Sequence, residues 1–142
     1  MPGYTVNAKS AEGFRIEVAT RNHLFVIDQA ETMGGKNEGP NPMEFTLAAL
    51  AGCMVTVGKI IAMQERLPVV GLEVKAEADL DVSVLMGKAE GSAGMSGIKV
   101  TIRVDAPQMS REEIEAFVQK IEKRCPVTDN LKNPTAISVV VD

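Results

Sequence analysis

Two cysteines, Cys53 and Cys125, are the residues of this 142-residue chain best suited to chemistry. A thiolate is a nucleophile that peroxides oxidise, and the sulfenic acid it becomes is usually resolved by a second thiol. A thiol in apolar surroundings stays protonated unless a neighbouring group favours the anion. From the residue pattern alone, two buried thiols acting as small hydrophobic residues are the plainer interpretation. Redox chemistry requires that folding bring Cys125 to Cys53.

The composition argues against several other kinds of function. The two cysteines lie far apart in the sequence and fit no zinc spacing, and the single His23 cannot complete a site, so we expect no metal or cofactor. The formal net charge is −4 without a basic cluster, which favours neither nucleic acid nor an anionic membrane as a partner. The first ten residues lack a basic region followed by an apolar run. We therefore expect a soluble, cytoplasmic protein, whose thiols are normally kept reduced.

The element that must position Cys53 is a long apolar helix. Asn41 suits the N-cap, Pro42 the first helical position, and Glu44 can complete a capping box with the Asn41 N–H. The pattern predicts a helix from about Pro42 to Arg66. No charged residue occurs from Phe45 to Gly58, which predicts a helix buried all round. That stretch of 14 residues is shorter than the roughly 20 needed to span a bilayer.

Cys125 is expected at the end of a second helix, which begins at the Ser110 capping box. Its apolar residues recur with helical spacing, and Cys125 lies four residues after Ile121, so it continues the buried stripe. Asp129–Asn133 is expected to form a short turn or helical fragment.

Alternation of apolar and polar residues predicts antiparallel strands. They are expected at Tyr4–Ala8, Phe14–Val18, Leu24–Asp28, Leu72–Leu85 and Ile98–Val104, with a last strand at Ala136–Val141 that is apolar on both faces. The order predicts a single α+β domain, residues 1–142, with antiparallel sheets wrapped around the long buried helix. That helix needs more cover than one chain can give, and a strip of small residues, Ala48, Gly52 and Thr56, would admit a second helix. We therefore predict an intertwined homodimer.

Two segments carry a resemblance to a known family. The stretch from Gly39-Pro40-Asn41-Pro42-Met43-Glu44 to Ala51-Gly52-Cys53, together with Arg124-Cys125-Pro126-Val127-Thr128, resembles the OsmC/Ohr family of osmotically inducible and organic hydroperoxide resistance proteins, in its OsmC-like branch. The resemblance implies an intertwined homodimer that reduces organic hydroperoxides without metal or haem. It also implies Cys53 as the peroxidatic residue, Cys125 as the resolving residue, and an external dithiol as the reductant.

The family pairs its reactive cysteine with an Arg and a Glu. The family Glu stands ten residues before the cysteine, where this chain has Met43, and Glu44 is one residue later. At about 100° per residue, Glu44 and Cys53 lie about half a turn apart on a straight helix. Glu44 is thus a candidate site residue whose plainer role is the cap. The candidates for the role of the family Arg are Arg15, Arg21 and Lys36. We expect Arg21 to take this role, because Arg15 fits the solvent-exposed face of a strand.

Two functions are weighed from the sequence. The first is a thiol peroxidase that acts through a Cys53 sulfenic acid and a Cys53–Cys125 disulfide. The alternative is an OsmC-like dimer with weak or no peroxidase activity, which binds a small apolar or thiol-bearing ligand at the subunit interface. Met43, in place of the family Glu, motivates the alternative.

Overall fold

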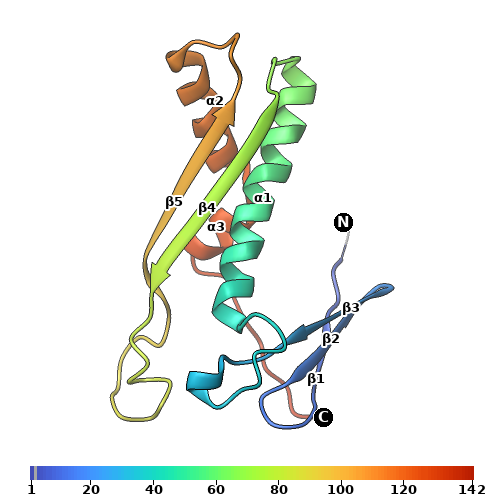
Figure 1. Ribbon diagram of the computed structural model, residues 1–142, viewed down its shortest axis with the longest axis vertical. Helices are drawn as coiled ribbons and strands as arrows, with labels where there is room; N and C mark the ends of the chain where they lie inside the picture. Colours follow the sequence, from blue (N-terminus) through green and yellow to red (C-terminus); the bar gives the residue numbers. More distant parts are fainter. Residues whose placement is uncertain (2) are drawn as a thin grey trace. The chain divides into compact units, whose positions relative to one another are not determined.

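The computed structural model describes Met1 and residues 3–142 and contains two compact units, Met1–Thr46 and Leu47–Asp142. The predicted α+β class with antiparallel sheets and a long helix is confirmed (Figure 1). The elements in chain order are β1 (Asn7–Ser10), β2 (Ile16–Thr20), β3 (His23–Ile27), the 3-10 helix η1 (Glu31–Met33), α1 (Pro42–Glu65), β4 (Gly71–Asp79), β5 (Ser96–Asp105), α2 (Arg111–Arg124) and α3 (Pro126–Lys132).

The first unit is built on the predicted three-stranded antiparallel meander, in the order β1-β2-β3. Val18, in the central strand, pairs with Ala8 on one side and Phe25 on the other, and it is buried. The Phe25 ring lies 5.2 Å from that of Phe45, measured between centroids. The first strand begins at Asn7 rather than at the predicted Tyr4, whose side chain is exposed.

A buried carboxylate, Asp28, organises the loop between β3 and α1. It accepts backbone N–H groups from Gln29 at 2.7 Å, Glu38 at 3.1 Å and Lys36 at 3.3 Å. These hydrogen bonds hold the pKa of Asp28 below its ordinary value despite burial, and the one from the Glu38 N–H has the largest effect. Gly39 brings the chain so close to Val26 that a Cβ would lie 2.2 Å from the Val26 carbonyl oxygen. The loop therefore has one defined path into the helix.

Helix α1 begins as predicted and exposes one face. Its buried residues are Leu50, Met54, Val57, Gly58 and Ile61. The predicted strip of small residues, Ala48, Gly52 and Thr56, lies exposed on the opposite side, since residues 47–142 cover the helix from one direction only. By length and composition α1 would also suit a membrane span, but a core helix meets the same criterion, and α1 contributes four side chains to the core.

The second unit packs α1 against the β4–β5 hairpin and α2 (Figure 1). In the antiparallel hairpin, Leu72 pairs with Val104 and Val74 with Ile102, and these residues face the core. Helix α2 begins at Ser110, whose hydroxyl accepts the Glu113 N–H at 3.1 Å, and it buries Phe117 and Ile121. The fully assembled core comprises Leu50, Met54, Val57, Ile61, Ala106, Met109, Phe117, Ile121 and Cys125.

The predicted strand Leu72–Leu85 is too long. Strand β4 ends at Asp79, because Asp81 turns the chain: its carboxylate accepts the Ser83 N–H at 2.9 Å and the Ser83 hydroxyl at 2.6 Å. A turn follows in which the Met86 N–H donates to the Val82 carbonyl at 2.9 Å. The apolar alternation continues past Asp79, but this local hydrogen bonding overrides it.

The predicted strand Ala136–Val141 is wrong for the single chain. These residues form no strand in the structure, and Ile137 and Val141 are 86% and 94% exposed. A strand needs a neighbouring edge for its backbone groups, and an apolar one also needs a face to cover it. The single chain provides neither to this segment.

Gly58 is expected to be indispensable for the packing of α1, because an alanine Cβ there would lie 2.6 Å from Leu72 Cδ1 and 3.1 Å from Ile121 Cδ1. Gly58→Ala should lower the free energy of unfolding by about 1–3 kcal/mol through overpacking. Urea denaturation measures this change. Leu72→Ala in the Gly58→Ala background should cost less than it costs in the native chain, and additive effects would contradict the clash.

Candidate active site

The structure brings Cys53 and Cys125 together. Cys53 lies in the middle of α1, and Cys125 joins α2 to α3 after continuing the buried stripe of α2 as predicted. Both are free thiols, and they lie close enough for each to influence the pKa of the other. Cys125 is 1% exposed, whereas Cys53 is half-buried. In the described part of the chain no three His, Cys, Asp or Glu side chains gather as they would to hold a metal.

The surroundings of Cys125 favour its thiolate. Cys125 is the N-cap residue of α3, with Pro126 at the first helical position. Burial raises the pKa of the Cys125 thiol, but the polar groups near its sulfur outweigh burial and lower it: the Thr128 hydroxyl first, then the Thr128 N–H, the Cys53 thiol and the Val127 N–H. Cys125 is therefore the more acidic member of the pair.

The surroundings of Cys53 have the opposite effect. Burial is the largest influence and raises the pKa of the Cys53 thiol; the Val127 N–H lowers it, and the neighbouring Cys125 raises it again, so that the net shift is upward. The lowered pKa expected of a peroxidatic cysteine falls on its neighbour instead.

Thr128 is the residue of this site that the sequence interpretation missed. Its side chain is 7% exposed, its hydroxyl has no hydrogen-bond partner among the described residues, and it lowers the pKa of the nearby Cys125 thiol. It also lines a cavity of about 1160 Å³ bounded by α1, β5, α2 and α3. The signal was present in the sequence, because a threonine three residues after an N-cap lies over that cap.

Glu44 lies in the capping box that the sequence predicts. The Asn41 N–H donates to Glu44 Oε1 at 3.0 Å, and the Glu44 N–H donates to Asn41 Oδ1 at 2.9 Å. Both partners are thereby satisfied at the start of α1. This arrangement accounts fully for a glutamate at this position, and a catalytic role for Glu44 stays a prediction.

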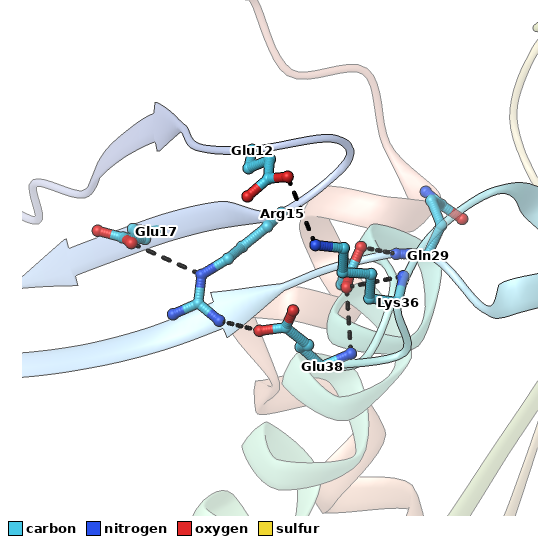
Figure 2. A network of polar contacts seen from close by, with 7 residues as sticks. Glu12, Arg15, Glu17, Gln29, Lys36 and Glu38 are labelled. Atoms are coloured by element: carbon cyan, nitrogen blue, oxygen red, sulfur yellow. Dashed lines mark hydrogen bonds and ion pairs between the residues drawn. The ribbon is translucent and has the colours of Figure 1, made fainter.

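The candidate cations lie in the first unit. Arg21 occupies the β2–β3 turn with φ of 50° and an exposed side chain. Arg15 is more constrained: it forms an ion pair with Glu17 at 3.6 Å and a shorter one with Glu38 (Figure 2). Lys36 reaches Glu12 at 3.6 Å. Arg21 makes no ion pair within the described residues, and its catalytic role stays a prediction.

Several known proteins resemble this chain. The organic hydroperoxide resistance protein of Xanthomonas axonopodis pv. citri is 30% identical over 99 residues, which are 70% of this chain and 64% of that protein, so the match spans less than two thirds of the relative. An OsmC-like protein from Mycoplasma pneumoniae superposes with a TM-score of 0.80 at 19% identity, covering 92% of this chain and 88% of its own. The organic hydroperoxide resistance protein OhrB of Bacillus subtilis gives 0.60 at 20% identity, covering 89% and 88%.

The family comparison covers most of the chain. The model of the family described as OsmC-like protein matches residues 35–140, a range that contains all of α1 and both cysteines. The solved structures are similar in fold, and the Xanthomonas protein is similar in sequence. The resemblance stated from the cysteine motifs is thereby confirmed, and this protein belongs to the OsmC-like family.

Proposed function

We propose that this protein is a cytoplasmic thiol peroxidase that reduces organic hydroperoxides in defence against oxidative stress. The observation that carries the proposal is the proximity of Cys53 and Cys125, since a peroxidatic thiol needs a resolving thiol within reach. Relatives named organic hydroperoxide resistance protein support the choice of substrate.

The exposure of the two thiols supports the proposed division of roles. Cys53 is half-buried and open to a substrate, whereas Cys125 is 1% exposed, so Cys53 is the attacking residue. Its thiolate attacks the distal oxygen of the hydroperoxide, the O–O bond breaks, and the alcohol leaves. The resulting Cys53 sulfenic acid is attacked by the Cys125 sulfur, which forms the disulfide and releases water. An external dithiol then reduces the disulfide and returns both thiols.

The proposed assembly is an intertwined homodimer. The exposed face of α1 carries small side chains, and a Cβ at Gly52 would meet no atom within 4 Å in the single chain. The apolar segment from Ile137 to Val141 is exposed as well. A second copy would cover both surfaces, which supports the dimer.

A second candidate function is favoured by one observation. Burial raises the pKa of Cys53, so less thiolate is present near neutral pH than in a free cysteine. A protein with this property would be a weak peroxidase. In this second candidate, the dimer binds a small apolar or thiol-bearing ligand at the subunit interface.

Substoichiometric cumene hydroperoxide should convert the reduced protein to a Cys53–Cys125 disulfide, which peptide mass spectrometry detects. Cys125→Ala should instead accumulate a Cys53 sulfenic acid that dimedone traps, because the resolving thiol is gone. Cys53→Ala should consume no hydroperoxide. If both thiols of the native protein stay reduced while a free thiol is oxidised in parallel, the ligand-binding candidate replaces the peroxidase.

Arg21 is proposed as the cation that assists Cys53. Arg21→Gln should lower kcat/KM for cumene hydroperoxide by about 10²- to 10³-fold, the usual effect of removing a charged donor from a reacting oxygen. Stopped-flow consumption of hydroperoxide measures the rate. Arg15→Gln is the matched control, because Arg15 already binds Glu17 and Glu38. A larger loss of activity from Arg15→Gln would transfer the role to Arg15.

Gly52→Leu tests the dimer. The single chain has room for a leucine there, so folding should persist, while the larger side chain should separate two helices that pack at this point. Sedimentation velocity should show a shift from dimer to monomer. Ala116→Leu places the same side chain on the exposed face of α2 and should leave the dimer unchanged. A monomeric native protein, or a Gly52→Leu dimer as stable as the native one, would refute this interface.

A further inference from the structure

One side of helix α1 has no cover within the single chain. Only 28% of the most apolar 18-residue stretch of α1 is buried. Gly52, Thr56, Lys59 and Met63 recur every three or four residues, so they lie along one side of the helix, and all four are exposed. Met63 is 79% exposed. This side, the open face of α1, is therefore largely uncharged and contains a single cation, Lys59.

The charged residues of α1 are not all paired. The helix has three of them, Glu44, Lys59 and Glu65. Glu65 is paired within the chain, since the Lys120 ammonium lies 2.6 Å from its carboxylate. Neither Glu44 nor Lys59 forms an ion pair with any residue that the structure describes. The capping box uses Oε1 of Glu44, which accepts the Asn41 N–H at 3.0 Å, but it leaves the charge of the carboxylate without a counter-ion.

These two charges lie at nearly equal distances on either side of Gly52. Glu44 precedes Gly52 by eight residues and Lys59 follows it by seven, which correspond to about 12 Å and about 10.5 Å along an α-helix. At about 100° per residue, both side chains lie on the same flank of the open face, about 60° apart. Gly52 has the smallest side chain of this face, and a Cβ there would meet no atom within 4 Å. A second helix therefore approaches α1 most closely at Gly52.

We propose that α1 packs antiparallel on α1 of a second copy, with Gly52 at the two-fold axis and Lys59 paired with Glu44 of the partner subunit at both ends of the contact. A two-fold axis across the helix places residues after Gly52 opposite residues before it on the same flank, so each lysine meets a carboxylate. Parallel packing would instead place Lys59 against Lys59 of the partner subunit, and like charges at an interface repel each other. The proposal rests on the proposed homodimer and adds its helix orientation, register and ion pairs.

Burial of the open face requires a counter-ion for Lys59. An unpaired ammonium at an interface loses hydration without compensation, whereas a paired one is neutralised. The flexible four-carbon stem of lysine spans the small difference in axial position between the two charges. Capping and pairing are compatible, because Glu44 is exposed and the cap leaves Oε2 of its carboxylate for the partner subunit.

Charge reversal in the full-length chain tests the pairing. Lys59→Glu places two carboxylates opposite each other at each end of the contact, and Glu44→Lys places two ammonium groups there. Each variant should raise the Kd of the dimer by about 100-fold, because two like-charge contacts replace two ion pairs. Sedimentation velocity over a dilution series measures this Kd. An equimolar mixture of the two variants should form heterodimers near the native affinity, since both contacts then join opposite charges.

Two further variants serve as controls. Lys88→Glu, on an exposed turn after β4, changes the net charge as much as Lys59→Glu does, and it should leave the Kd unchanged. Glu44→Gln keeps the capping box and removes only the charge. If Glu44→Lys does not fold, Glu44→Gln takes its place: introduced together with Lys59→Glu, it removes the repulsion and should lower the Kd about tenfold relative to Lys59→Glu alone.

Two results would overturn the inference. The first is a native dimer whose Kd does not respond to Lys59→Glu. The second is a pair of folded charge-reversed variants that associate no better when mixed than each does alone. Either result would leave the homodimer itself intact and reject only this register. A native protein that is monomeric would instead refute the proposed homodimer, and with it this contact.

Discussion

The close approach of α1 to the hairpin and α2 is the constraint on which the second unit depends. It is permitted by one missing side chain, because Gly58 lies against Leu72 and Ile121 where a Cβ has no space. This contact aligns the buried stripes of α1 and α2 in one core. Cys125 belongs to this core and the half-buried Cys53 packs against it, so the packing that stabilises the unit also brings the thiols together. Structural and chemical requirements therefore act on the same helix pair.

Local signals predicted the elements well, and non-local requirements explain the failures. The caps at Asn41 and Ser110 fixed the starts of two helices, since they depend only on neighbouring residues. The strand Leu72–Leu85 was predicted too long because a side-chain turn at Asp81 competes with alternation. The pattern of Ala136–Val141 could not show whether this segment forms a strand, because a strand needs the edge of a neighbouring strand for its backbone hydrogen bonds.

The sequence predicted which two thiols form the candidate site, but not how they ionise. The sequence motifs contain both cysteines, but the pKa values of the two thiols depend on which polar groups the fold places near each sulfur. No spacing rule shows that polar groups near the Cys125 sulfur lower its pKa while burial raises the pKa of Cys53. Likewise, the sequence placed Asp28 at the end of an expected strand, but did not show that it would accept three backbone N–H groups. Such details depend on tertiary contacts.

The asymmetry between the two sulfurs also bears on how an oxidised pair would be reopened. In thiol–disulfide exchange, the sulfur that departs most readily is the one whose thiolate is more stable, and the incoming thiolate must reach the other sulfur. Cys125 is buried and its pKa is lowered, whereas Cys53 is half-buried and its pKa is raised. Both factors direct a reducing thiol to the Cys53 sulfur with Cys125 as the leaving group. The different surroundings of the two sulfurs would thus decide the regiochemistry of recycling.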